Sequence, residues 1–338
     1  MTCQSDFSEY LEDAIQSVST NIPRAFEDRG IFMHELCQSI SLPDNNLVLF
    51  KYQPFNERNV QDLLHGVVHV ASAYRMNDVN EGWQFFDKSK VIGAFDPEID
   101  DKKIKAVASF AKRLFPEDET NRMPTEDFLR SFISSGDAER LVIEQADHMV
   151  SAQPMLRKKQ MCASFSESCT SASMWDRYAN GHKGFVAEYR SDSCTVSCVK
   201  SRRDAFTQND AFFAALFPVL YGKRADISTL FPALSGVGQD FGKNTGLEFI
   251  YLLACLAYKA KEWEHEQEWR IATYKPERSL ETVYACLAPR AIYLGLNMNA
   301  DERARLLEVA QVLGIKTYDM EIDFESIDYS LKVCAAES

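Results

Sequence analysis

The sequence predicts an α+β fold with a mixed central sheet and helical blocks of unequal length. Short runs of β-forming residues recur along the chain, and the helical stretches between them differ widely in length. This irregular spacing favours α+β over a regular doubly wound sheet. A hydrophobic fraction of 46%, with 22 Phe, supplies enough apolar material for a core.

The N-terminal part is expected to be a helical extension over residues 1–45, followed by one α+β domain over 46–338. Apolar side chains recur at helical spacing in the extension: Phe7, Leu11, Ile15 and Val18. The tract at about 85–157 is mostly helical in pattern, so we expect a helical insertion within the domain.

Strands and helices of the domain follow from alternation and end signals. Strands are expected at 47–52, 67–70, 161–166, 184–189, about 268–274, 283–287, 291–296, 317–322 and 329–333. Helices are expected from Asn56 to Gly66, through Trp175 and Tyr178 to Gly181, and over 206–217, 246–259 and 300–313.

Charge and composition exclude several classes. The net charge of −13 makes general nucleic-acid binding a poor fit, because such binding depends on neutralising phosphates. The longest apolar stretch, 249–258, is about half the length of a membrane span, so no membrane role is expected. Nine cysteines without a CxxC pair indicate free thiols rather than a zinc site, and we expect a cytoplasmic protein with no bound metal.

Two candidate clusters lie near the first two strands. Lys51 and Tyr52 end the first strand, although a lysine there is also typical of a charged strand edge. Arg75 and Asn77 follow the second strand, where loops commonly build sites. An ordinary turn and helix cap would explain the second cluster equally well.

A third cluster combines hydroxyls with aromatic side chains. Ser164 and Ser166 flank a phenylalanine at the end of a strand, and two hydroxyls there need partners. Trp175, Tyr178 and His182 would share one face of a helix. The alternative is an aromatic core stripe with a hydrogen-bonded histidine.

The fourth cluster runs from Lys259 to Arg270. In a strand that begins near Glu266, the side chains of Glu266, Glu268 and Arg270 point to one face, and those of Trp269 and Ile271 to the other. Such charges are costly to bury unless they pair or bind something. A charged helical surface with four-residue spacing is the competing interpretation.

In this order the clusters resemble a bacterial family known as domain of unknown function two-nine-seven-one. The resemblance spans roughly Leu47 to Val333. It is carried by Lys51-Tyr52, Asn77 through Glu81, Ser164-Phe165-Ser166, Trp175 through Ala179 with His182 through Phe185, and Lys259 through Arg270. The chain departs from the family pattern at Val79, Ser164 and Arg177, which replace proline, cysteine and histidine.

The layout is also similar to that of ADP-ribosyltransferases, which break the nicotinamide bond of NAD. That similarity implies NAD as co-substrate, Glu268 as the key carboxylate and Glu266 near the acceptor. It also implies an ADP-ribosyltransferase-like fold. The side chains implied for cofactor binding are Lys51, Tyr52, Arg75, Asn77, Ser164, Ser166, Trp175, Tyr178, His182 and Arg270.

The function expected first is therefore an NAD-consuming glycosyl transfer or NAD hydrolysis, as in a toxin or an antiviral defence effector. Its partners would be a small-molecule nucleotide and a macromolecular acceptor or protein. One alternative is a non-catalytic protein-binding module in which the same charges form a structural network. Another is a metal-dependent hydrolase or nuclease that uses Asp78, Glu81, Glu266 and Glu268 as oxygen ligands.

Overall fold

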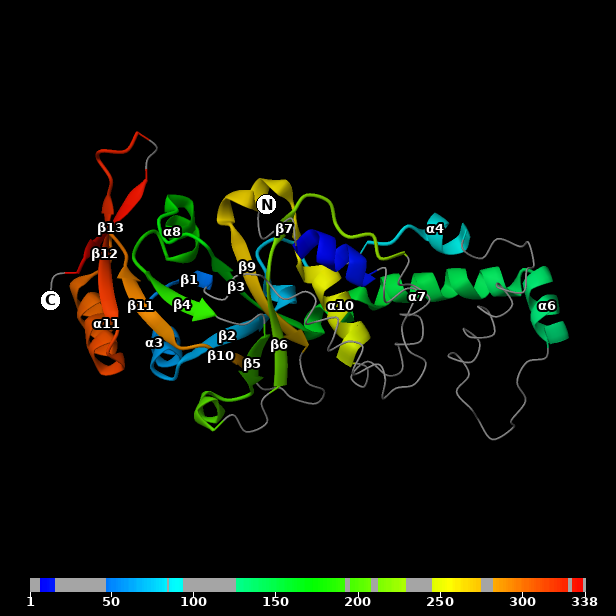
Figure 1. The fold of residues 1–338 in the computed structure, drawn as a ribbon, viewed down its shortest axis with the longest axis horizontal. Helices are drawn as coiled ribbons and strands as arrows, with labels where there is room; N and C mark the ends of the chain where they lie inside the picture. Colours follow the sequence, from blue (N-terminus) through cyan, green and yellow to red (C-terminus); the bar gives the residue numbers. More distant parts are fainter. Residues whose placement is uncertain are drawn as a thin grey trace.

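The α+β class is confirmed. The computed structural model of the protein describes residues 7–15, 47–83, 85–93, 126–191, 195–207, 212–228, 245–274, 282–327 and 330–336. Val18 and the prolines at 97, 116 and 124 lie outside these residues. Most described strands join one eleven-stranded sheet, and helices flank it and extend beyond one end (Figure 1).

The sheet has the strand order β13-β12-β11-β4-β1-β3-β2-β10-β5-β6-β9, and β3 also pairs with β9. That extra pairing closes six of the strands into a ring, while β1, β4, β11, β12 and β13 continue from β3 as an open sheet. The strands are β1 (Leu47–Gln53), β2 (Val67–Ser72), β3 (Gln160–Ser166), β4 (Phe185–Ser191), β5 (Thr195–Val199), β6 (Phe212–Pro218), β9 (Glu268–Tyr274), β10 (Val283–Cys286), β11 (Pro289–Leu294), β12 (Lys316–Ile322) and β13 (Leu331–Ala335).

The sheet is mixed, as predicted, because β11 and β12 pair in parallel. The other neighbouring strands among the described residues pair antiparallel. A second, two-stranded sheet joins β7 (Leu220–Tyr221) to β8 (Tyr258–Lys259). This small sheet fixes Lys259 beside the closed ring.

The helices are unequal in length, also as predicted. They are α3 (Glu57–Leu64), α4 (Lys88–Gly93), α6 (Glu126–Ser134), α7 (Asp137–Lys159), α8 (Ala172–Tyr178), α10 (Thr245–Leu256) and α11 (Ala300–Leu313), with 3-10 turns η1 (Ala73–Arg75), η2 (Arg202–Phe206) and η5 (Lys261–Glu266). Figure 1 shows α7 reaching away from the sheet, with α6 at its far end. Residues 7–15 form a further helix near the N-terminus.

Helix α3 begins and ends where its sequence signals predict. The side chain of Asn56 accepts a hydrogen bond from the backbone N–H of Asn59 and so satisfies one free donor of the first turn. Gly66, just after the helix, has a φ of 61°, a conformation that favours glycine. Strand β2 therefore begins directly after this glycine.

Every strand of the closed ring contributes to one apolar cluster. In β3 the buried Ala163 and Phe165 belong to it, and in β9 so do Trp269 and Ile271. Because side chains alternate along a strand, the residues between them face the other way. The prediction that Trp269 and Ile271 point opposite to Glu268 and Arg270 is confirmed.

A second cluster covers the outer face of the ring with α10 and the N-terminal helix. Phe7 is fully buried, and its ring stacks on Phe217 of β6 with 6.0 Å between centroids. Leu11 is buried in the same cluster. The described part of the predicted N-terminal extension is therefore built into the core.

Three details of the predicted elements are wrong. The helix predicted over 206–217 is instead η2, which ends at Phe206, and the strand β6. The run Phe212–Pro218 is almost continuously apolar, and periodicity alone does not separate a buried strand from a buried helix in so short a run. Strand β5 was not predicted, and the helix predicted over 246–259 ends at Leu256, so that Lys259 lies in the strand β8. Strand β9 has the predicted range 268–274, and Glu266 lies before it, in η5.

No helix among the described residues has both the length and the apolar character needed to cross a membrane.

Candidate functional site

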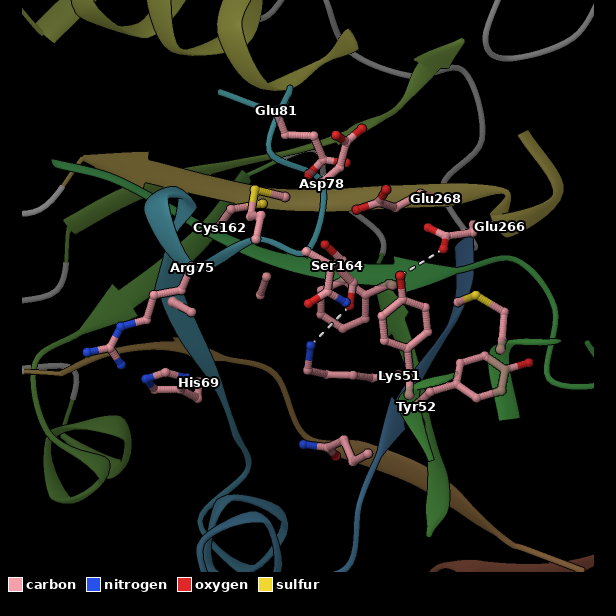
Figure 2. A pocket seen from close by; sticks show the side chains of 18 of the residues that line it. Lys51, Tyr52, His69, Arg75, Asp78, Glu81, Cys162, Ser164, Glu266 and Glu268 are labelled. Carbon is pink, nitrogen blue, oxygen red and sulfur yellow. Dashed lines mark hydrogen bonds between the residues drawn. The ribbon is translucent and has the colours of Figure 1, made fainter. Parts of the chain in front are cut away.

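The predicted clusters meet around one cleft of about 330 Å³, formed by β1, β2, β3, β8, β9, α8, η1, η5 and the loop after η1. This volume lies at the lower end of the range for small-molecule sites. The predicted side chains that line it are Lys51, Tyr52, Arg75, Asn77, Ser164, Tyr178, Glu266 and Glu268. Figure 2 shows Glu266 and Glu268 on one side of the cleft, with His69 and Arg75 on the opposite side.

Strand pairing sets the positions of the central residues. Ser166 of β3 pairs with Phe50 of β1 on one side and with Glu268 of β9 on the other. Two residues earlier in β3, Ser164 pairs with Arg270. Segments separated by more than a hundred positions in the chain are thereby held in fixed register.

A buried ammonium group organises the acidic side of the cleft. Lys259 Nζ lies 2.6 Å from Glu266 Oε2, 2.8 Å from Glu268 Oε2 and 3.2 Å from Glu81 Oε1. All four side chains are at most 5% exposed. Desolvation at this depth strengthens the attraction between unlike charges.

Arg270 forms the rear of the same network. Its guanidinium donates to both carboxylate oxygens of Glu268, at 2.8 and 2.9 Å, and to the backbone oxygen of Leu256 at 2.6 Å. Arg270 Nη2 also lies 3.0 Å from Glu81 Oε1. Burial alone would raise the pKa of Glu268, but Arg270 and Lys259 hold this pKa at about 2.

Glu266 is the carboxylate with a partner from the cleft wall. Tyr178 Oη donates to Glu266 Oε1 at 2.8 Å, and Ser166 Oγ donates to the Glu266 backbone oxygen at 2.7 Å. Arg177, which is 45% exposed, reaches Glu266 only at 3.9 Å. Burial and the charge of Glu266 raise the pKa of Tyr178 to about 12, so its phenol remains a donor at neutral pH.

The buried part of the network carries an excess negative charge. Three carboxylates, those of Glu81, Glu266 and Glu268, face two cations, those of Lys259 and Arg270. Positive charge comes from Arg75, on the opposite side of the cleft, and from Lys51, which lies between Arg75 and the carboxylates (Figure 2). The cleft therefore has an acidic and a basic end.

Lys51 lies in the middle of the cleft and contacts neutral groups there. Its Nζ donates to the backbone oxygen of Ser164 at 3.0 Å and lies 5.2 Å from the ring centroid of Phe165. Burial lowers the pKa of Lys51 to about 8. An ammonium that has no carboxylate partner among the described residues is suited to binding an anionic group.

Four predicted site residues stand behind the cleft wall. Trp175 is fully buried, donates from Nε1 to the Cys169 oxygen, and packs edge-on against Tyr52. Helix α8 ends at Tyr178, and His182 (φ 64°) returns to stack on Trp175 at 6.3 Å. Ser166 and Arg270 position Glu266 and Glu268 from below.

Tyr52 lines the cleft but uses its hydroxyl elsewhere, since Oη donates to the Ser168 oxygen at 2.8 Å. Burial raises the pKa of Cys162, which also lines the cleft, to about 12. A thiol with this pKa is not an activated nucleophile at neutral pH. Nucleophilic chemistry through Cys162 therefore has no support in this geometry.

The candidate acidic metal ligands do not form a metal centre in this structure. Lys259 Nζ occupies the space between Glu81, Glu266 and Glu268. Within the described residues, no group of three or more His, Cys, Asp or Glu side chains is placed to hold a metal ion.

Several cleft residues were not assigned to the nucleotide site from the sequence. His69 lines the cleft from β2, and the ring centroid of Trp263 in η5 lies 4.8 Å from Lys259 Nζ. Lys259 lies three residues after the end of the apolar helix α10, and this position is the signal that could have identified it as buried. His69 sits alone among valines and gave no comparable signal.

The segment that supplies Tyr178, Lys259, Glu266, Glu268 and Arg270, but not Glu81, matches a known family model. Residues 174–271 match the family model described as protein of unknown function, DUF2971. The predicted resemblance is confirmed over this segment, which runs from α8 into β9. Lys51 and Arg75 lie outside the DUF2971 match. No curated protein and no solved structure matches the chain.

Proposed function

We propose that the protein is an NAD-consuming enzyme that breaks the bond between nicotinamide and ribose. The observation that supports this proposal best is the cleft with two oppositely charged ends. NAD joins a cationic nicotinamide ring to an anionic diphosphate, so one ligand complements both ends. In this arrangement Lys51 and Arg75 face the diphosphate, and the buried carboxylates face the nicotinamide ribose.

The chemistry requires a carboxylate where positive charge develops. As the bond between the ribose carbon and nicotinamide breaks, its electron pair leaves with the neutral nicotinamide and the ribose becomes cationic. Water or an acceptor hydroxyl then bonds to that carbon and releases a proton. A pre-positioned anion lowers the barrier of such a step without reorganising.

The contacts favour Glu266 over Glu268 for this role. Both oxygens of Glu268 are engaged by Arg270 and Lys259, so this carboxylate serves to position the network. Both oxygens of Glu266 are also engaged, Oε2 by Lys259 and Oε1 by Tyr178, but Tyr178 is a neutral group that lines the cleft. We therefore place Glu266 next to the reacting ribose, with Tyr178 or Trp263 against the leaving ring.

The test is release of nicotinamide from NAD by purified protein, measured by chromatography. Glu266→Gln is expected to reduce the rate by about 100-fold or more, because it removes the anion but keeps the amide oxygen as an acceptor. Glu264→Gln is the matched control, since Glu264 is 53% exposed and pairs with Lys261 at the surface.

Thermal melting of both variants shows whether the fold is retained. Absence of nicotinamide release by the wild-type protein, or full activity of Glu266→Gln, would contradict the proposal.

A non-catalytic binding module is the second candidate, and the extensive pairing of the buried charges supports it. In this case the network only shapes the cleft, so the protein binds a nucleotide and leaves it intact. NAD that binds in calorimetry and is recovered unchanged after prolonged incubation would favour this function.

A further inference from the structure

A second cavity adjoins the cleft on its basic side. It is a hollow of about 540 Å³ that is largely open to solvent, and it is lined by Glu57 and Arg58 of α3, Arg202 of η2, and Tyr284 of β10. His69 and Arg75 line both cavities, so the two spaces share a wall. The side chains of His69 and Arg75 therefore border both spaces.

Two arginines of this cavity are not neutralised. Arg58 and Arg75 are exposed, and within the described residues neither guanidinium forms an ion pair. Arg202 is held in place by Asp62, with 2.6 Å between Nε and Oδ1, and lies 5.2 Å from the ring centroid of Tyr284. A fixed arginine next to two free ones forms a site for an oxyanion.

The state of His69 is consistent with a positive field at the shared wall. Burial, together with the positive charges of Arg58, Lys51, Arg202 and Arg75, lowers the pKa of His69 to about 4. The imidazole is thus neutral at physiological pH and adds no charge of its own. Positive charge that gathers around a neutral histidine is available for a bound anion.

We propose that the second cavity is a phosphate-binding subsite for the adenylate half of a dinucleotide. The cleft alone, at about 330 Å³, is small for a dinucleotide, and the adjoining second cavity provides space for the other half. The inference rests on the proposed function for the identity of the dinucleotide. The phosphate site itself rests on the cavity and its arginines.

Binding of ADP, adenosine 2′-phosphate and adenosine to the full chain, measured by calorimetry, tests the subsite. ADP or adenosine 2′-phosphate is expected to bind at least about tenfold more tightly than adenosine, and the stronger of the two identifies which phosphate is held. Arg58→Gln should weaken that ligand about tenfold and leave adenosine unchanged. Arg203→Gln, at an exposed neighbour of Arg202 outside the cavity, should change neither.

Equal binding of the phosphorylated ligands and adenosine would overturn the inference, as would equal effects of Arg58→Gln and Arg203→Gln. These outcomes can be distinguished from success or failure of the proposed NAD cleavage. If NAD is not cleaved but Arg58 governs phosphate affinity, the subsite stands and the reaction fails. If NAD is cleaved but Arg58→Gln matches its control, the subsite fails alone.

Discussion

At the scale of single residues, the Glu268 carboxylate accepts hydrogen bonds from two buried cations, Lys259 and Arg270. Glu268→Gln removes its charge while Arg270 and Lys259 stay in place. Breaking a buried pair in this way costs about 3–5 kcal/mol. Urea unfolding at pH 7 should therefore show a markedly lower free energy of unfolding, and Glu264→Gln should not.

The same substitution, Glu268→Gln, should also remove part of the pH dependence of the unfolding free energy. The pKa of Glu268 is about 2 in the folded protein, below the ordinary value of 4.5, so its contribution to stability is complete above pH 4.5. The contribution is lost as the pH falls towards 2. The difference in unfolding free energy between wild type and variant should shrink as the pH falls from about 4.5 towards 2. A difference that stays constant would show that Glu268 is not held as an ion by this network.

At the scale of elements, Gly184 lets β4 begin directly beside the end of β1. A Cβ at this position would lie 2.2 Å from the backbone oxygen of Gln53, which lines the cleft, and 2.9 Å from that of Ala179. Backbone atoms cannot move aside cheaply, so Gly184→Ala is expected to cost about 3 kcal/mol or more.

Gly314→Ala provides the comparison, because Gly314 has a φ of 65° but open space around its Cβ position. Its cost should be only about 1 kcal/mol, from backbone strain alone. Chemical denaturation of both variants measures the difference. Equal losses would mean that β1 and β4 do not approach as closely as described.

The elements also show which parts of the fold the sequence can predict. Alternation and capping signals predicted β1, β2, β3 and both ends of α3, because those signals are local. The β3–β9 pairing that closes the ring was not predictable, since it joins residues more than a hundred positions apart. Helical spacing placed His182 on the face of Tyr178, but α8 stops at Tyr178 and a turn with positive φ follows.

The candidate site was predictable to the same degree. The charged pattern around Glu266 and Glu268 identified the acidic end, because burial of such residues demands partners. The second cavity was not foreseen, since Arg58, Arg75 and Arg202 come from three separate elements. Only the folded arrangement brings them together.

At the scale of the whole molecule, the N-terminal helix is a structural part of the ring. Phe7→Ala would leave a cavity against Phe217 and is expected to cost about 3–5 kcal/mol. Tyr10→Ala, on the exposed side of the same helix, should change the unfolding free energy by less than about 0.5 kcal/mol. Thermal or urea unfolding of the pair would decide this. A small effect of Phe7→Ala would mean that the helix docks only weakly.

Ring closure through β3 and β9 has a consequence for biosynthesis. Glu81 and β3 emerge from the ribosome well before Glu268 and Arg270, which complete their pairing. At typical elongation speeds the delay is on the order of 10 s. During that interval the nascent chain presents an unpaired strand edge, the kind of surface that chaperones shield. The cleft, and any activity that depends on it, therefore cannot form until translation has passed Arg270.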